Sequence, residues 1–400
     1  MDDVPTHRSI VLLSVGHGCV DVYQGAVAAL VPFFISERSY SYAAASGVVL
    51  AASLLSSVAQ PLFGAVTDRR ALPWLLPVST LIGGVGIALS GVAGSYPLTL
   101  AFVAVSGVGV AAYHPESARV ARIASRGSHT AMGWFSLGGN IGFVVAPLMV
   151  AMVVTAGGLR LSPLLVVPAL VGSVLCLPVV RALDGTSSSG LDPSVSGGGG
   201  SIDDRASFVR LALAVVCRSV VFVGLSAFIS LYAQARTSGG AAAGTAALVL
   251  LYAGGAAGTV LGGNLAGRWG RVPAARRSYL IAAVAVAGVV LVPGPAFYLF
   301  VALAATALYV PFSLQITLGQ DYLPSRVGTS SGIILGLTVS IGGLASPAIG
   351  AVADATSLRV ALAPLIVMPL LSWLLFRTLP EPLSTTTERL NKVQEPPRVR

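Results

Sequence analysis

Twelve long stretches of this chain are apolar and nearly free of charge, and each is close in length to a helix that spans a bilayer. Only 10% of the 400 residues are charged and 55% are hydrophobic, whereas soluble domains carry about 25% charged residues. A chain with so little charge cannot cover a surface that faces water. Spanning helices need ~20 apolar residues, and no period-two alternation favours strands. The sequence predicts an all-α integral membrane protein with twelve transmembrane helices at about 9–34, 43–66, 73–93, 97–121, 128–154, 160–181, 207–233, 243–266, 278–294, 297–320, 328–353 and 359–379.

The basic residues predict how these helices are oriented. With the N-terminus placed in the cytoplasm, 18 of the 24 Lys and Arg residues fall on the cytoplasmic side and four fall outside. Only Arg119 and Arg218 remain within the membrane. This positive-inside bias places both termini in the cytoplasm. We therefore interpret the net charge of +9 as a topology signal, which argues against nucleic acid as a partner.

The chain divides into two similar halves. A Gly- and Ser-rich segment at 184–206 predicts a flexible cytoplasmic linker. It separates an N-terminal six-helix bundle (1–183) from a C-terminal one (207–380), and 381–400 is predicted to be a disordered cytoplasmic tail. "GAVTDRR" at 64–70 and "GNLAGRWGR" at 263–271 are offset by 199 residues, and Pro147 and Pro347 by 200. Such a repeat predicts a substrate site between the halves, near the midplane.

Glycines spaced four residues apart predict helix faces that pack closely, because lipid supplies no hydrophobic drive for helix association. They are Gly138 and Gly142, Gly254, Gly258 and Gly262, and Gly332 and Gly336.

These features resemble the major facilitator superfamily, which carries a Gly-x-x-x-Asp-Arg signature after the second span and a weaker copy after the eighth. Within it, the chain resembles the fosmidomycin resistance protein family of efflux transporters. The supporting stretches are "HGCVDVYQGAVAALVPF", "QPLFGAVTDRRALPW", "YHPESARVA" and "CRSVVFVGLSAFISLY".

The resemblance implies the major facilitator fold, alternating access and usually proton-driven antiport. It also implies that Gly64, Asp68 and Arg69 form part of a cytoplasmic gate. The second copy offers Gly263, Arg268 and Arg271, but Gly267 stands where the acid would be, so the resemblance does not imply a symmetric gate. The Arg that many proton-coupled drug antiporters of the superfamily carry in the first half of span four is absent here.

Asp21 is the clearest candidate for a proton-coupling residue. It lies at least ten residues from either end of the first predicted span, where a carboxylate must be paired, hydrated or protonated. A carboxyl group that takes up and releases a proton is what proton coupling requires, and the alternative is a static salt bridge or a hydrogen-bonded structural acid. His17 lies one turn earlier on the same face. Tyr23 and Gln24 extend this polar stripe, which we expect to face a substrate cavity.

His114, Glu116 and Arg119 lie within six positions in the inner half of the fourth span, beside Pro115, which can bend the helix. In one interpretation Glu116 and Arg119 neutralise each other, or Arg119 caps the helix end. In the other, which we favour, the cluster pairs with Asp21 and exchanges partners during transport. Glu116 is then a second proton-coupling candidate, and His114 and Arg119 are candidate substrate-binding residues.

Arg218 is the corresponding charge of the second half, about eleven residues into span seven. Because Arg stays charged, it needs an acid, a bound anion or water. It either reaches Asp21 or Glu116 across the interface, or attracts an anionic substrate such as a phosphonate or carboxylate, which a guanidinium group binds bidentately. Further candidate substrate-binding residues are Asn140, Tyr309 and Gln315.

The sequence thus predicts a secondary active transporter rather than an enzyme. It contains no Walker loop, His-Glu-x-x-His or Cys-x-x-Cys motif, so we expect neither cofactor nor metal. The expected partners are a small-molecule substrate, protons and the lipid bilayer, and we expect a monomer in a bacterial plasma membrane. Proton-coupled efflux is the favoured function, and the alternatives are uptake of an organic anion or a non-transporting membrane sensor.

Overall fold

The computed structural model describes residues 6–125, 129–184 and 203–382, and these residues form helices joined by short loops. The helices of the first half are α1 (Thr6–Arg38), α2 (Tyr42–Arg69), α3 (Leu75–Ser90), α4 (Tyr96–Ser125), α5 (His129–Gly157), η1 (Leu159–Val166) and α6 (Val167–Asp184). Those of the second half are α7 (Arg205–Arg236), α8 (Gly240–Trp269), α9 (Arg271–Leu291), α10 (Ala296–Tyr322), η2 (Pro324–Arg326), α11 (Val327–Ala355), α12 (Leu358–Leu362), η3 (Ala363–Ile366) and α13 (Val367–Arg377).

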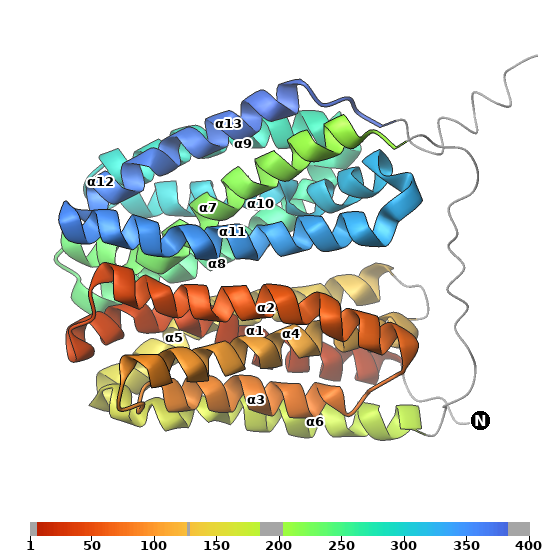
Figure 1. Ribbon diagram of the computed structural model, residues 1–400, viewed down its shortest axis with the longest axis horizontal. Coiled ribbons are helices and arrows are strands. Elements are labelled where there is room, and N and C mark those ends of the chain that lie inside the picture. The colour runs from red at the N-terminus through yellow and green to blue at the C-terminus, as the bar shows by residue number, and fades with distance from the viewer. Residues whose placement is uncertain (1–5, 126–128, 185–202, 383–400) are drawn as a thin grey trace, which may run out of the picture.

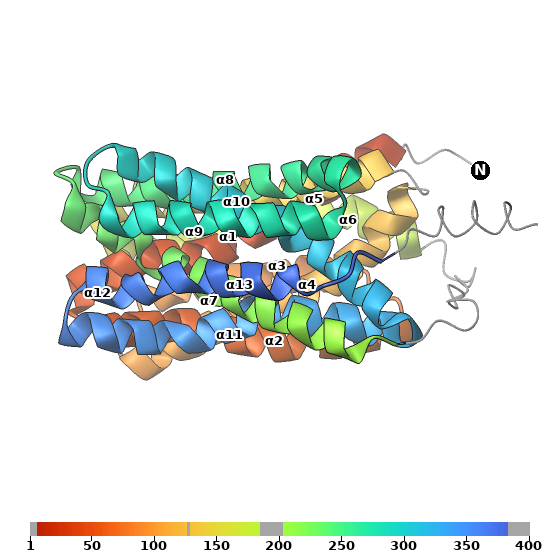
Figure 2. The ribbon, with the colours of Figure 1, turned by 90° about the horizontal axis from the view of Figure 1, so that it is seen from above.

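The helices form two groups that lie side by side with their axes roughly parallel (Figures 1 and 2). Helices α1 to α6 make up one group and α7 to α13 the other. The groups meet mainly where α2 packs on α11 and α5 packs on α8, with α1 against α7 between these contacts. We call the end where α1 begins and α13 ends the terminal end (right in Figure 1), and the opposite end the distal end.

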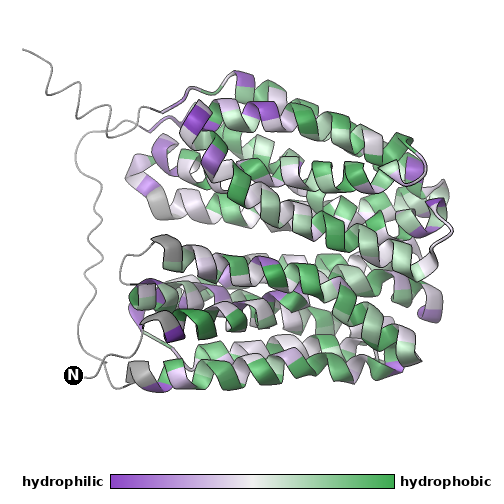
Figure 3. Ribbon diagram, turned by 180° about the vertical axis from the view of Figure 1, so that it is seen from behind, coloured by the Kyte–Doolittle hydropathy of each residue, from purple (hydrophilic) through white to green (hydrophobic). Residues whose placement is uncertain are grey.

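The lengths of the helices suit a bilayer, in which every backbone polar group must be paired within the helix. Eleven helical segments of the described residues are long and apolar enough to cross a membrane. The twelfth, α3, is apolar but has only 16 residues, shorter than the predicted span at 73–93. Figure 3 shows hydrophobic residues along most of each helix and hydrophilic ones gathered mainly at the two ends.

The last span of each half is a composite, where the sequence predicted one continuous helix. The sixth span begins as the 3-10 segment η1 and continues as α6, whereas the twelfth begins with the short helix α12 and passes through the 3-10 segment η3 into α13. Pro163 lies in η1 and Pro364 in η3, and each lacks the N–H that an α-helical bond requires. The stretches "LSPLLVVPAL" at 161–170 and "LAPLIVMPLL" at 362–371 match at an offset of 201. They are a further copy of the internal repeat.

Close packing between α8 and α10 depends on the glycines of α8. A methyl group added at Gly258 would meet the carbonyl oxygen of Thr306, and Gly254 and Gly262 face backbone carbonyls of α10 in the same way. On α5, Gly138 and Gly142 face the backbone of α1. Both predicted glycine faces are therefore confirmed as packing faces.

The third predicted glycine face is different. A methyl group at Gly332 or Gly336 on α11 would meet no atom within 4 Å. Among the described side chains, the prediction that these two glycines pack against another helix is wrong for this structure, because no described atom of a neighbouring helix lies at their level.

Most of the predicted linker and tail lies outside the described residues, which omit 185–202 and 383–400. The residues that border these segments make defined contacts. Asp204 caps α7 by accepting the Ser207 N–H, and the bonds from Ser207 lower the pKa of its carboxyl group. Asp203 accepts a hydrogen bond from Ser325, and Glu381 binds the start of α9.

We expect Gly258→Ala to lower the thermal stability of the protein, because the added methyl group overpacks the contact with α10. Overpacking costs about 1–3 kcal/mol, which should appear as a lower melting temperature in detergent, followed by tryptophan fluorescence. Gly336→Ala is the matched control, since its methyl group meets no atom within 4 Å. Equal shifts in the two variants would contradict the packing role of Gly258.

Candidate functional site

Asp21 lies at the centre of a cluster formed by three helices of the first half. Its Oδ2 atom is 3.2 Å from Nε2 of His17 on α1, and its Oδ1 atom is 3.4 Å from Nε2 of His114 on α4. Only 6% of Asp21 is exposed. Nδ1 of His17 is 2.9 Å from the carbonyl oxygen of Phe135 on α5, and the two rings stack. Asp21 thus contacts two imidazoles, whereas the sequence pointed to Arg119 or Arg218.

The hydrogen bonds of His17 determine where a proton must lie. The Phe135 carbonyl can only accept, so Nδ1 of His17 donates to it. In a neutral ring Nε2 then carries a lone pair, which faces a carboxyl oxygen at 3.2 Å. This contact is attractive only with a proton between the atoms, either as imidazolium and carboxylate or as neutral imidazole and carboxylic acid. The pair therefore holds a proton in both forms.

The same cluster also has the spacing of a metal site. The ligand atoms of His17, Asp21 and His114 lie within 4.8 Å of one another. Three donors leave a tetrahedral site open at its fourth position. The contact with His17 accounts for Oδ2 of Asp21, whereas Oδ1 lies 3.4 Å from His114 without a hydrogen bond.

Glu116 and Arg119 pair with each other on α4. Nε of Arg119 is 3.0 Å from Oε2 of Glu116, and a second contact joins Nη2 to Oε1. Glu116 is fully buried and also accepts the N–H of Leu72, in the loop between α2 and α3. The cluster is therefore split: His114 faces Asp21, whereas Glu116 and Arg119 fasten a loop at the terminal end. Of the two interpretations of the sequence, this conformation has the mutual ion pair.

Arg218 is buried in the second half without an acid. It is 1% exposed, and Nη2 donates to Oγ1 of Thr338 on α11 at 3.1 Å. Its guanidinium carbon is 5.7 Å from the ring centre of Tyr309 and 5.3 Å from that of Phe312, so the rings provide cation–π contacts. Nε has no hydrogen-bond partner, and no acid among the described residues forms an ion pair with Arg218.

Gln315 and Asn140 make local contacts. Nε2 of Gln315 is 2.6 Å from the hydroxyl oxygen of Tyr279 on α9, and its Oε1 atom has no partner. Asn140 is half-buried and donates to the Ser136 carbonyl of its own helix. Neither Gln315 nor Asn140 has a hydrogen bond to Asp21 or Arg218 among the described contacts.

A cavity lies between the two halves. It encloses about 800 Å³, open solvent at its mouth included, which is within the usual range for small-molecule sites. The lining is mostly apolar and aromatic with scattered hydroxyl groups. It includes Tyr23, Gln24, Ser53, Ser56, Ser106 and Phe143 from the first half, and Phe222, Ser226, Tyr252, Tyr309 and Thr338 from the second.

Three predicted binding residues line this cavity directly: Tyr23, Gln24 and Tyr309. The Tyr23 hydroxyl bonds to Leu165 O and Ala169 N at the start of the sixth span, so only its ring remains for a ligand. Arg218 reaches the lining through Thr338 and Tyr309. The predicted residues His17, His114, Arg119, Asn140 and Gln315 are not part of the lining.

Sequence reasoning missed the aromatic part of this lining and the hydrogen-bond partner of Arg218. Phe143, Phe222 and Tyr252 gave no signal of their own in apolar helices, where aromatic residues are common. Thr338 could have been singled out as a polar residue in span eleven, although its contact with Arg218 depends on how α11 is rotated against α7.

The six predicted gate residues lie at the terminal end in different surroundings. A methyl group added at Gly64 or Gly263 would meet no described atom within 4 Å. Arg69 and Arg268 are exposed. Asp68 lies in α2, but its side chain is outside the described part of the structure.

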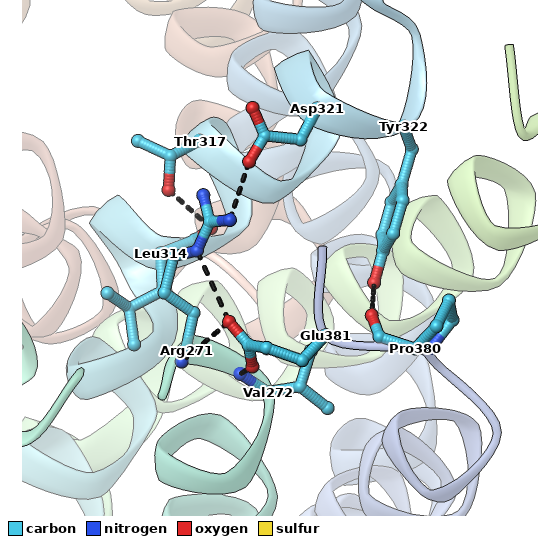
Figure 4. Close-up of polar contacts among 8 residues, drawn as sticks. All are labelled: Arg271, Val272, Leu314, Thr317, Asp321, Tyr322, Pro380 and Glu381. Atoms are coloured by element: carbon cyan, nitrogen blue, oxygen red, sulfur yellow. Dashed lines mark hydrogen bonds and ion pairs between the residues drawn. The ribbon is translucent and has the colours of Figure 1, made fainter. Parts of the chain in front are cut away.

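Arg271, the sixth gate residue, is the hub of an ion-pair network at the start of α9 (Figure 4). Its Nη2 atom is 2.5 Å from Oδ2 of Asp321 on α10, and its Nε is 3.5 Å from Oε1 of Glu381. Glu381 also accepts the backbone N–H groups of Arg271 and Val272. Beside it, the Tyr322 hydroxyl donates to the Pro380 carbonyl. The network fastens the chain after α13 to α9 and α10.

Two helical halves that face each other across a cavity, with ionisable side chains buried in each, define a membrane transport protein. The chain belongs to the Major Facilitator Superfamily, which matches residues 13–347. This confirms the predicted fold class and shows that the chain is a multi-pass membrane transporter rather than an enzyme.

Two bacterial relatives resemble nearly the whole chain. The Fosmidomycin resistance protein of Escherichia coli (strain K12) is 27% identical over 372 residues, which cover 90% of each chain. The Uncharacterized MFS-type transporter YfnC of Bacillus subtilis (strain 168) is 26% identical over 382 residues, which cover 92% of this chain and 91% of the relative.

Solved structures have the same fold. A bacterial homologue of the human lysosomal transporter Spinster, in an inward-facing and occupied conformation, gives a TM-score of 0.75 at 16% identity and covers 99% of this chain and 100% of its own. The nucleoside transporter NupG gives a TM-score of 0.72 at 11% identity, with 94% and 98% covered.

We expect Glu116 and Arg119 to be strongly coupled in stability. Glu116→Gln leaves Arg119 without its acid, and Arg119→Gln leaves a buried carboxylate uncompensated, which costs about 3–5 kcal/mol for fully buried pairs and less here because 25% of the Arg119 side chain is exposed. The double variant should lose less than the sum of the two. A double-mutant cycle of unfolding in mixed micelles measures this, and an additive result would contradict the pairing.

Proposed function

We propose that the protein is a proton-driven exporter of small anionic or amphiphilic compounds. It takes up a proton at Asp21 and binds the compound in the cavity between the halves, beside Arg218. The observation that carries this proposal is the pairing of Asp21 with two imidazoles, because among the described residues this buried cluster brings a carboxyl group and imidazoles close enough to share an exchangeable proton.

The position of the cluster supports a role in coupling. Asp21 and His17 are on α1, which also contributes Tyr23 and Gln24 to the cavity. His114 is on α4, which lines the cavity at Ser106. In the proposed cycle, the movement of the halves changes how far α1 and α4 are exposed to water. Water that reaches the cluster can accept its proton, while Asp21, His17 and His114 stay together within one half. Proton release can thus be linked to the state of the cavity.

The second half supports an anionic or partly anionic compound. Arg218 has one hydroxyl partner, two aromatic rings and an unpaired Nε atom. A phosphonate or carboxylate would supply the missing charge, and the aromatic lining suits an apolar body on the same molecule. The resemblance to a fosmidomycin resistance protein supports fosmidomycin as the first compound to test and export as the direction.

The topology assigned from the sequence completes the proposal. The terminal end is the cytoplasmic one, in the plasma membrane of a bacterium, because most basic residues lie there. A monomer suffices, since each half supplies part of one cavity.

We expect Asp21→Asn to abolish substrate-dependent proton movement, because an amide cannot exchange a proton in this range. The measurement uses purified protein in liposomes with a trapped pH-sensitive dye, an imposed proton gradient and fosmidomycin as the probe. Glu37→Gln is the matched control: it removes a carboxylate from the same helix, where Glu37 binds the N–H of Leu159, and should leave proton movement unchanged.

The other outcomes of this experiment are equally informative. Unchanged movement in Asp21→Asn together with loss in Glu116→Gln would move the coupling role to Glu116. Anion uptake driven by inward proton flow would support import. Absence of movement with every compound would remove the proposal of proton-driven export while leaving the fold unaffected.

We expect Arg218→Lys to weaken fosmidomycin binding about tenfold, because an ammonium group cannot make bidentate bonds to a phosphonate. Isothermal titration of the purified protein in detergent measures the dissociation constant. Arg210→Lys is the control and should bind as the wild type does, because Arg210 lies on the same helix but donates to the Thr378 carbonyl, away from the cavity lining. Equal affinity in both variants would mean that Arg218 does not bind the anionic group.

A further inference from the structure

Asp354 on α11 binds the first turn of a helix in the other half. Its Oδ1 accepts the N–H of Tyr42 at 2.7 Å and its Oδ2 accepts the N–H of Ala43 at 2.9 Å. These are the first two residues of α2, whose N–H groups have no acceptor within the helix. The Ala44 N–H is capped locally by Ser41. One half of the protein therefore supplies a large part of the cap for a helix of the other half.

This cap differs from every other carboxylate contact among the described side chains. Glu116 binds the N–H of Leu72 and Glu37 that of Leu159, both within the first half. Glu381 caps α9 and Asp204 caps α7 within the second. The ion pairs of the described residues also stay within one half. Of these carboxylate contacts, only that of Asp354 must break when α2 and α11 move apart.

The helices around Asp354 are in close contact at the distal end. Gly350, one turn earlier, lies against the carbonyl oxygen of Tyr42 and the hydroxyl of Ser46, and Gly343 lies against Ser53. The Tyr42 ring also meets Phe228 of α7 edge-on. A carboxylate at a helix N-terminus adds an electrostatic attraction to this packing, because the helix dipole places partial positive charge there.

Toward the terminal end the glycines of these two helices have open space among the described side chains. Methyl groups at Gly64 on α2, or at Gly332 and Gly336 on α11, would meet no described atom within 4 Å. The close glycine contacts between α2 and α11 that the structure describes, at Gly343 and Gly350, thus lie toward the distal end.

We propose that Asp354 is a latch residue that holds the distal end closed and thereby sets the balance between the two conformations of the transporter. It acts as a positioning residue, through the backbone of α2, and has no contact with substrate. The inference rests on the alternating movement of the halves and is independent of the substrate and of the coupling ion. Its failure and the failure of the proposed proton-driven export are therefore distinguishable.

Asp354→Asn is the direct test. The neutral amide has one acceptor oxygen, and its NH2 group would face a backbone donor, so at least one of the two bonds is lost. Hydrogen bonds to charged groups are strong enough that we expect the ratio of distal-open to distal-closed protein to rise about tenfold.

Electron–electron distance measurements on purified full-length protein can follow both ends. The three cysteines are replaced by Ala, and spin labels are placed at exposed residues in two pairs. Gly94 and Ser238 report the distal end, and Arg122 and Arg326 the terminal end. In Asp354→Asn the distal pair should gain a longer distance and the terminal pair a shorter one. A merely structural role would not shorten the terminal distance.

Two further variants keep the inference testable if Asp354→Asn fails to fold. Tyr42→Pro removes one of the two donors while leaving Asp354 intact, and Pro is tolerated at the first residue of a helix. Ser41 before it already has an extended backbone, with φ −65° and ψ 165°, as a residue before Pro requires. Tyr42→Ala, which keeps the N–H, controls for loss of the ring.

Glu37→Gln is the matched control for the charge change. It alters a carboxylate that binds a helix-start N–H within one half and should leave both distances unchanged. Unchanged distances in Asp354→Asn and Tyr42→Pro, or the same shift in Glu37→Gln, would overturn the latch. Longer distances for both label pairs at once would also overturn the latch role of Asp354. Such a result would mean that the whole protein had loosened, rather than that one conformation had been exchanged for the other.

Discussion

An ionisable side chain buried in a membrane protein must find its partner inside the protein, because the bilayer core offers no water. The two halves meet this constraint differently. Among the described side chains of the first half, the two buried acids have partners on their own side: Asp21 has two imidazoles, and Glu116 has Arg119 and a backbone N–H. In the second half Arg218 has a hydroxyl group and two rings but no acid. The first half therefore contains partners for its own buried acids, whereas the second has a positive charge that is only partly compensated.

In the proposed function, this asymmetry lets one cavity serve two ligands of opposite charge. The proton and the anion would not compete for one side chain, because Asp21 and Arg218 contact different groups in different halves. They are nevertheless linked through the cavity, which α1 lines with Tyr23 and Gln24 and the second half lines with Tyr309 and Thr338. A movement of one half against the other changes the surroundings of both charges together. Coupling of this kind requires two states of the whole molecule, and no direct ion pair across the interface is needed.

The sequence predicted the spans, the repeat and the buried charges, because length, apolar composition and spacing decide these locally. It also predicted that His17 and Asp21 meet, since residues four apart share a helix face. It could not predict that His114, rather than Arg119, turns toward Asp21, because that depends on how α4 is rotated against α1. The cavity lining was largely missed for the same reason: Phe222 and Tyr252 differ from other aromatic residues only in the direction they face. The composite sixth and twelfth spans were predictable from Pro163 and Pro364, had the proline pattern been compared between the halves.

The glycines of α11 show how tertiary arrangement decides what a local pattern means. Gly332, Gly336, Gly343 and Gly350 lie along one helix, yet only the last two touch a neighbour in this structure. A transporter that closes one end at a time needs contact faces at both ends, and in any one state half of them are unused. Small residues suit such faces, because they allow close approach without side chains that must repack when the contact breaks. The backbone cap that Asp354 gives to α2 has the same property, since two hydrogen bonds to N–H groups can form and break without rearranging either helix.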